Sequence, residues 1–154
     1  MRALVTGAAG FIGSSLVDAL LDAGAEVVGV DAFTGNYDPA RNRANLEGAL
    51  HRRGFRLVEA DLRHAELEPL VKGATHVVHL AALPGVRASW GEAFRDYAEH
   101  NVVGTQRLLE AVRAAGGVER LVAASSSSIY GMPRRFPTPE DEPPRPLSPY
   151  GVTK

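Results

Sequence analysis

Two residues near the end of the chain have the types and the spacing of an acid–base pair. Tyr150 and Lys154 lie four positions apart, which places both side chains on one face of a helix. A tyrosine with its ordinary pKa of about 10 is a poor base at neutral pH, and a neighbouring cation favours its phenolate form. The pair predicts a proton-transfer site, although a Tyr-x-x-x-Lys pair taken alone is more often a surface helix turn.

A glycine-rich turn near the start of the chain predicts a dinucleotide-binding site. Gly7, Gly10 and Gly13 stand in TGAAGFIG (residues 6–13), between an expected strand and an expected helix. They would allow a tight turn, a close approach of the backbone to a pyrophosphate, and close packing of the helix on the strand. Asp31, after the second expected strand, can accept hydrogen bonds from the ribose hydroxyls of NAD and would repel the 2′-phosphate of NADP. Its alternative role is a cap at the strand end.

The elements that must position these residues alternate along the chain. Apolar segments rich in β-branched residues predict strands over residues 2–7, 26–31, 55–61, 76–82 and 120–128. Helical patterns cover residues 11–24, 39–54, 65–73 and 93–116. The proline-rich residues 131–149 predict an extended loop. This order predicts an α/β fold, a doubly wound parallel sheet covered by helices on both faces.

Size and composition exclude several classes of protein. The 154 residues fit one domain, and a net charge of -1 offers no basic surplus for nucleic acid or an anionic membrane. The chain has no cysteine and its five histidines lack metal-ligand spacing, so we expect no metal site. The cluster of Arg41, Arg43, Arg52 and Arg53 is best interpreted as a solvated helix face. No apolar segment is long enough for a signal peptide or a membrane span, which predicts a cytoplasmic location.

Five motifs in this order resemble the extended short-chain dehydrogenase/reductase family, and more closely its NAD-dependent sugar-nucleotide epimerases and dehydratases. They are TGAAGFIG, HLAA (79–82), NVVGT (101–105), SSSSIYG (125–131) and YGVTK (150–154). The resemblance covers the whole chain and implies a Rossmann-like NAD-binding domain over residues 1–154.

The resemblance also implies a role for each matching residue. The residues it implies for binding NAD are Gly7, Gly10, Phe11, Ile12, Gly13, Asp31, Asp61, Leu62, Leu80, Ala81, Ala82, Asn101, Tyr150 and Lys154. In this set Asp61 and Leu62 would meet the adenine, and Asn101 would lie on a helix behind the active site. The implied catalytic residues are Ser126, Tyr150 and Lys154, and Ser126 would also bind the substrate through its reacting oxygen.

The reaction is narrowed by two further features. The 4,6-dehydratases of the family carry Asp-Glu after the catalytic Ser or Thr, where this chain has Ser127 and Ser128. Residues 35–47 and 82–90 resemble segments of uronate-type UDP-sugar 4-epimerases. Arg87 would then meet a carboxylate or phosphate of the substrate, unless it is a loop arginine paired with an acid. The resemblance favours a UDP-glucuronate 4-epimerase, with UDP-glucose 4-epimerase, UDP-glucuronate decarboxylase and other dehydratases or reductases of the family as alternatives.

Members of the family are longer than this chain, and their later part completes the sheet and supplies the substrate-binding domain. The resemblance therefore predicts a sheet that stops after its fifth strand, an exposed strand edge, no substrate-binding domain, and little support for the helix that carries Tyr150. A dinucleotide-binding module without turnover is the competing hypothesis. The resemblance further implies a homodimer, with residues 93–116 forming one of the interface helices.

Overall fold

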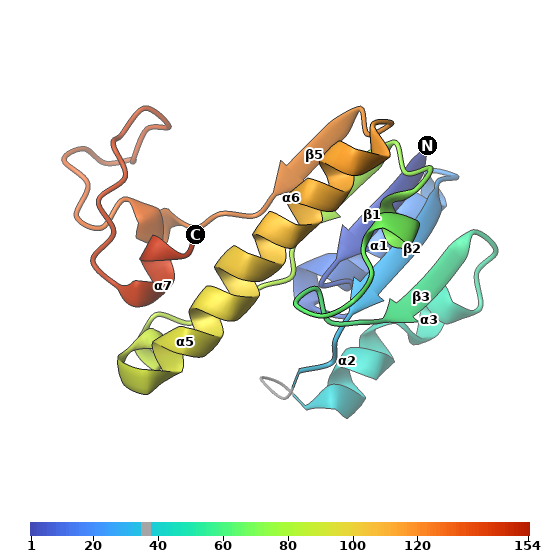
Figure 1. The fold of residues 1–154 in the computed structure, drawn as a ribbon, viewed down its shortest axis with the longest axis horizontal. Coiled ribbons are helices and arrows are strands. Elements are labelled where there is room, and N and C mark those ends of the chain that lie inside the picture. Colours follow the sequence, from blue (N-terminus) through green and yellow to red (C-terminus); the bar gives the residue numbers. More distant parts are fainter. Residues whose placement is uncertain (35–37) are drawn as a thin grey trace.

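A computed structural model describes residues 1–34 and 38–154. Five parallel strands form one sheet in the order β3-β2-β1-β4-β5 (Figure 1). The strands are β1 (Arg2–Thr6), β2 (Glu26–Asp31), β3 (Phe55–Glu59), β4 (His76–His79) and β5 (Arg120–Ala123). The structure confirms the predicted α/β fold, a Rossmann-like doubly wound sheet, with β5 at one edge.

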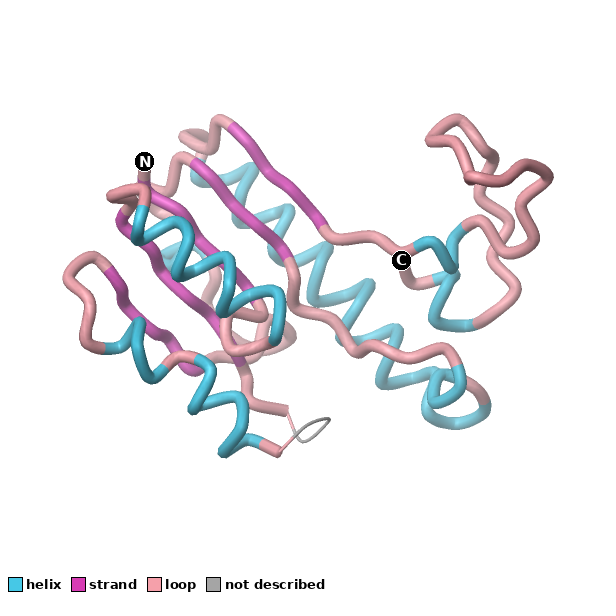
Figure 2. Tube along the Cα trace, turned by 180° about the vertical axis from the view of Figure 1, so that it is seen from behind, coloured by secondary structure: helices cyan, strands magenta, loops and turns pink. Residues whose placement is uncertain are grey.

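Helices cover both faces of the sheet because consecutive strand residues point to opposite sides. Val5 of β1 belongs to the core that includes Val17 of α1, whereas its neighbour Leu4 belongs to the core that includes Leu108 of α6. The helices of the first face lie in front of the sheet in Figure 2. The first face carries α1 (Phe11–Asp22), α2 (Pro39–Asn45) and α3 (Glu47–Leu50), and the second carries α4 (Glu68–Val71) and α6 (Gly104–Ala115).

Several elements are shorter than the sequence pattern predicts. The helix expected over residues 39–54 is divided into α2 and α3 at Leu46, which is fully buried in the first core. The helix expected over residues 65–73 is reduced to α4, with Pro69 in its first turn. Strand β4 ends at His79 because its neighbour β1 turns away at Gly7, which has a positive φ of 69°.

The long helix expected over residues 93–116 forms, but it contains a π-helical segment. It runs from a short 3₁₀ turn (Gly91–Ala93) through α5 (Phe94–Tyr97), the π-helical segment η3 (Ala98–Val103) and α6. Asn101 lies in this segment and is buried, with 5% of its surface exposed. Such π-helical insertions are frequent at functional sites, since they turn one side chain out of the regular α-helical register.

The last part of the chain forms a lobe beyond the carboxyl ends of the strands (Figure 1). A 3₁₀ turn η4 (Ser127–Ile129) and a helix α7 (Pro149–Val152) are joined by the predicted extended loop. The expectation that the helix of Tyr150 lacks support was wrong. The hydroxyl of Ser148 caps it by accepting from the Gly151 amide at 3.0 Å, and the Tyr150 amide donates to the hydroxyl of Ser89 at 3.0 Å.

Substitution of Gly13 tests the packing of α1 on the turn that precedes it. A Cβ at Gly13 would overlap the carbonyl oxygen of Gly7, a backbone atom that cannot move without opening the turn. We expect Gly13→Ala to lower the free energy of unfolding by about 1–3 kcal/mol in urea denaturation. Gly48→Ala in α3 is the matched control, because no atom lies within 4 Å of its added Cβ, and it should raise the free energy by up to about 1 kcal/mol. Equal effects of the two substitutions would contradict this packing.

Candidate active site

A cavity of about 540 Å³ opens at the carboxyl ends of the strands. It lies where the strand order reverses between β1 and β4, the position at which open α/β sheets bind their ligands. All but one of the residues predicted to bind a cofactor line it, namely Gly7, Gly10, Phe11, Ile12, Gly13, Asp31, Asp61, Leu62, Leu80, Ala81, Ala82, Tyr150 and Lys154. The exception is Asn101.

The turn between β1 and α1 presents backbone donors to this cavity. A Cβ at Gly7 would lie 2.8 Å from the Ala81 nitrogen, so glycine allows β1 and the end of β4 to approach there. Gly10 is the N-cap of α1 and brings no side chain to satisfy the first N–H groups of the helix. Phe11, the first helical residue, is 86% exposed. Free N–H groups at a helix N-terminus fit an anionic phosphate.

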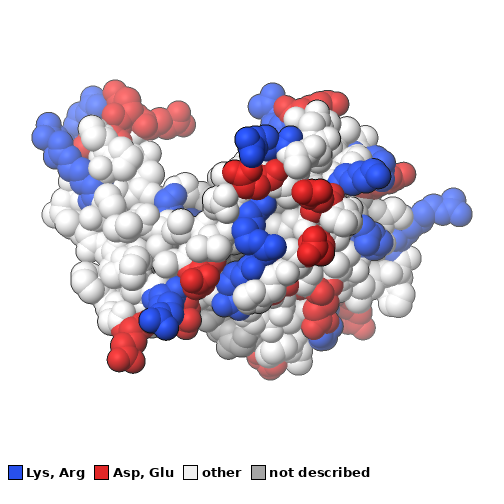
Figure 3. Space-filling view, in the orientation of Figure 1, with Lys and Arg blue, Asp and Glu red and all other residues white. Residues whose placement is uncertain are grey.

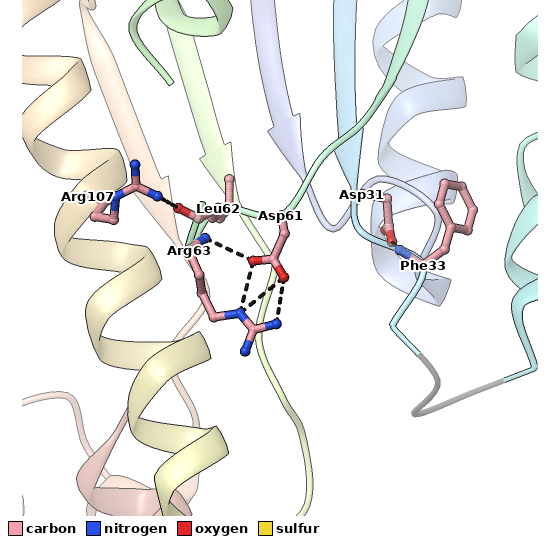
Figure 4. A network of polar contacts seen from close by, with 6 residues as sticks. All are labelled: Asp31, Phe33, Asp61, Leu62, Arg63 and Arg107. Carbon is pink, nitrogen blue, oxygen red and sulfur yellow. Dashed lines mark hydrogen bonds and ion pairs between the residues drawn. The ribbon is translucent and has the colours of Figure 1, made fainter. Parts of the chain in front are cut away.

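Asp31 both orders the backbone and faces the cavity. One of its carboxylate oxygens accepts from the Ala9 amide at 2.9 Å, and the other accepts from the Phe33 amide at 2.9 Å (Figure 4). The alternative role of Asp31 as a strand-end cap is therefore also realised. Each oxygen keeps lone-pair capacity for a further donor, so capping and the predicted ribose contact are compatible.

Asp61 is held by an arginine that the sequence analysis did not single out. The side chain of Arg63 donates to both carboxylate oxygens of Asp61, the shortest contact being 2.6 Å from Nη2 to Oδ2, and its backbone amide donates at 2.9 Å (Figure 4). These bonds lower the pKa of Asp61 to about 2. Arg107 of α6 anchors the same loop by donating to the carbonyl oxygen of Leu62 at 2.6 Å. Asp61 is thus ionised and fixed at the cavity edge.

Asn101 contacts its neighbours and does not line the cavity. Its Oδ1 accepts from the Leu83 amide at 2.7 Å, and its Nδ2 donates to the Leu83 carbonyl at 3.1 Å and to the Thr153 hydroxyl at 3.0 Å. Both amide protons are therefore used inside the protein. The residue positions the end of the β4 loop and the helix α7, and its contact with the cofactor stays a prediction.

Tyr150 and Lys154 reach the cavity from α7 and the residues after it. The ring of Tyr150 packs edge-to-face on Tyr97 of α5, with centroids 6.2 Å apart. Lys154 is partly buried, and this burial lowers its pKa. The Ser125 hydroxyl donates to the Lys154 carbonyl at 3.2 Å. The structure thus brings the Tyr–Lys pair to the same cavity as the glycine turn.

Two predicted substrate contacts do not line this cavity. The Ser126 hydroxyl accepts from the Ser128 amide at 3.2 Å and caps η4, while its neighbour Ser125 forms part of the cavity wall. Arg87 begins the short 3₁₀ turn η1 (Arg87–Ser89), is exposed, and has no acidic partner among the described residues. Residues 35–37, in the segment predicted to resemble uronate epimerases, lie outside the described residues.

The described residues were also compared with the requirements of a metal site and of a membrane span. Within residues 1–34 and 38–154, no cluster of three or more His, Cys, Asp or Glu side chains could hold a metal ion. No helix in this part of the chain is long and apolar enough to cross a membrane. On the face drawn in Figure 3, Lys and Arg are interspersed with Asp and Glu.

A buried histidine next to the cavity makes the stability of the protein depend on pH. His79 is 6% exposed, and burial, together with the charge of Lys154, lowers its pKa to about 4. The unfolded chain, in which this pKa is about 6.5, binds the proton first. The contribution of neutral His79 to the free energy of unfolding is therefore complete above pH 6.5 and is lost as the pH falls to about 4. The total loss is up to about 3 kcal/mol.

We expect urea denaturation to give a lower free energy of unfolding at pH 4.5 than at pH 7. Burial also lowers the pKa of His100, so the free energy of unfolding should still depend on pH to some extent when His79 is replaced. Asp61 titrates below this window. His79→Gln should flatten the pH dependence, and an unchanged slope in that variant would show that His79 is not its source.

The chain is similar to known proteins over nearly its whole length. The family model described as the NAD dependent epimerase/dehydratase family matches residues 3–154. The chain is 45% identical to a Bacillus subtilis protein described as an uncharacterized UDP-glucose epimerase, YtcB, over all of this chain and 48% of the relative. It is 43% identical to UDP-glucuronate 4-epimerase 1 of Arabidopsis thaliana, over 98% of this chain and 36% of the relative.

A solved structure has the same fold. The UDP-glucuronic acid 4-epimerase from Bacillus cereus, crystallised with UDP-glucuronic acid and NAD, superposes with a TM-score of 0.95 at 42% identity. The superposition covers all of this chain and 49% of the Bacillus cereus chain. The chain thus spans 36–49% of the length of these three proteins.

Proposed function

Because this chain belongs to the NAD-dependent epimerase/dehydratase family, we propose that it forms the cofactor site and the Tyr–Lys pair of a UDP-sugar 4-epimerase. The observation that carries the proposal is the meeting of the glycine turn, Asp31, Tyr150 and Lys154 at one cavity. The relatives that match this chain over its whole length include UDP-glucuronate and UDP-glucose epimerases.

NAD fits the groups that line the cavity. The free N–H groups at the start of α1 suit its pyrophosphate, and Asp31 suits the hydroxyls of its adenosine ribose. Ionised Asp61 and the backbone of Leu62 suit the adenine. Bound there, NAD would supply a hydride acceptor for C4 of the sugar and return the hydride to the opposite face.

The chain contributes the proton chemistry of this proposal. Tyr150, as phenolate, takes the proton from the C4 hydroxyl of the sugar. Lys154, four residues further along and just beyond α7, favours the phenolate through its positive charge and holds the nicotinamide ribose. Ser126, which follows the cavity-lining Ser125, hydrogen-bonds the reacting oxygen. Ser127 and Ser128 stand where the elimination of water would require carboxylates, so a dehydratase is a less favoured alternative, and UDP-glucuronate decarboxylase ranks after the two epimerases.

UDP-glucuronate is the favoured substrate and UDP-glucose the second. The first is supported by the 42% identity to an epimerase crystallised with UDP-glucuronic acid, and by the exposed Arg87, which has the charge to bind a sugar carboxylate. The second is supported by the 45% identity to the Bacillus subtilis protein named for UDP-glucose.

The substrate is tested by incubating the protein at its natural full length with each UDP-sugar and separating the C4 epimers by chromatography. We expect faster conversion of UDP-glucuronate than of UDP-glucose, and a larger loss for UDP-glucuronate in Arg87→Gln. No turnover of the uronate would exclude the favoured substrate.

Tyr150→Phe should lower kcat by about 10²–10⁴-fold through loss of the base, with NAD binding retained.

Asp31 predicts selection of NAD over NADP. The carboxylate accepts from ribose hydroxyls and repels a 2′-phosphate. Calorimetric titration should show tight binding of NAD and at least about 100-fold weaker binding of NADP, a difference of about 2.7 kcal/mol. Asp31→Asn removes the charge and keeps one acceptor oxygen, so one of the two backbone amides loses its partner, and the preference for NAD should shrink. An unchanged preference in that variant would locate the selection elsewhere.

The competing hypothesis for these 154 residues is NAD binding without turnover. Titration of the chain with NAD and an assay for sugar conversion separate the two: binding and conversion support the epimerase, and binding alone supports the module.

Assembly and location complete the proposal. The exposed apolar side chains Val102, Val103 and Leu109 on the long helix support a homodimer, and light scattering on the full-length protein should give twice the monomer mass. A cytoplasmic location is proposed from the absence of an apolar span in the sequence.

A further inference from the structure

His79 stands at the centre of a chain of hydrogen bonds that the proposed reaction does not use. Its Nδ1 lies 2.7 Å from the hydroxyl of Thr6 at the end of β1, and its Nε2 lies 2.8 Å from the hydroxyl of Thr105 in α6. Thr6 is fully buried, and His79 itself is 6% exposed. Buried polar groups of this kind must be satisfied by one another.

The direction of every bond in the chain follows from its two ends. The Thr105 hydroxyl donates to the Asn101 carbonyl at 2.6 Å, so its oxygen can only accept from His79. The Thr6 hydroxyl accepts from the amide of Ala81 and shares the amide of Leu80 with the Thr6 carbonyl, each at 3.2 Å, so its single proton is available for His79. His79 must then donate from Nε2 and accept at Nδ1.

Only the neutral Nε2–H ring satisfies this arrangement. A protonated ring would carry a donor at Nδ1, which would face a Thr6 oxygen whose lone pairs already serve two backbone amides. The other tautomer would leave two donors opposed at the Nδ1 side and a bare nitrogen next to the committed hydroxyl of Thr105. Each of these alternatives leaves a buried group unpaired, which is costly.

The chain joins two parts of the site that are distant in sequence. At one end it fixes the Leu80 and Ala81 amides, which belong to the cavity wall. At the other it fixes the carbonyl of Asn101, whose side chain holds Leu83 and the Thr153 hydroxyl next to the Tyr–Lys pair.

We propose that His79 is a positioning residue, held as the neutral Nε2–H tautomer, that ties the cofactor wall at the ends of β1 and β4 to the π-helical segment and, through Asn101, to the helix of Tyr150. The tie itself follows from the geometry of this chain. Its consequence for turnover rests on the proposed function.

The tautomer is tested directly on the wild-type chain. Long-range ¹H–¹⁵N NMR spectra, with the His79 signal assigned by its loss in His79→Gln, should show a protonated Nε2 and an unprotonated Nδ1 at pH 7. A protonated Nδ1, or rapid averaging between the two tautomers, would overturn the proposal.

Two substitutions of His79 separate the effect of its hydrogen bonds from the effect of the volume that its side chain fills. His79→Gln can donate to Thr105 from its amide nitrogen and accept from Thr6 at its amide oxygen, whereas His79→Leu can do neither. We expect NAD to bind His79→Gln within about threefold of wild type, and His79→Leu about tenfold more weakly, a change of about 1.4 kcal/mol. Equal NAD affinities in the leucine variant and wild type would overturn the proposal.

Thr105→Val keeps the shape of the side chain and removes the hydroxyl between His79 and Asn101. Its loss of NAD affinity should not add to that of His79→Leu in the double variant, because either change breaks the same chain. Full additivity would overturn the tie.

In the full-length protein the leucine variant should lower kcat more than it raises KM for the UDP-sugar, and unchanged kinetic constants would count against the tie. If wild type does not convert any UDP-sugar, the proposed function fails while the NMR and NAD measurements still decide the tie.

Discussion

The geometry of the cavity depends on the side-chain amide of Asn101, which is buried behind the cavity wall. Its three hydrogen bonds hold the backbone of Leu83 after β4 and the hydroxyl of Thr153 after α7 in fixed relation to the long helix. The π-helical segment places this residue. The bond from the Tyr150 amide to Ser89 and the packing of Tyr150 on Tyr97 add to this tie, and together they hold the lobe that follows β5 against the long helix (Figure 2). Catalytic groups tolerate only small errors of placement, since a shift of about 1 Å can cost about 100-fold in rate.

On the cofactor side of the site, the residues that face the cavity also hold the surrounding backbone in place. Asp31 accepts from the amide of Phe33 in its own loop and from the amide of Ala9 in the glycine turn, and Asp61 accepts from the amide of Arg63. The groups assigned to NAD therefore also fix the backbone around the cavity. Arg63 and Arg107 extend this support from the β3 loop to α6. Loops held in this way are ordered before a ligand binds, and a ligand then costs less conformational entropy to bind.

The sequence predicts those features that follow from local chemistry. The alternation of apolar and helical segments predicts all five strands and their parallel direction, although not their order in the sheet, and the glycine spacing predicts the turn at the cavity. It does not predict the π-helical segment, the division of residues 39–54 at Leu46, or the partners of His79 and Arg63, because each depends on contacts between residues far apart in the chain. The Asp-x-Arg spacing after β3 was the one local signal for Arg63. Ser126 and Arg87 remain predictions, since the described cavity wall includes neither.

The reaction that we propose for the full-length protein is oxidation at C4 of a UDP-sugar followed by return of the same hydrogen. The most direct test uses UDP-glucuronate that carries deuterium at C4, converted in ordinary water by the protein at its natural full length. We expect the C4 epimer to retain the deuterium at C4, as measured by mass spectrometry and NMR. A C4 epimer that carries hydrogen from water at this position would contradict it.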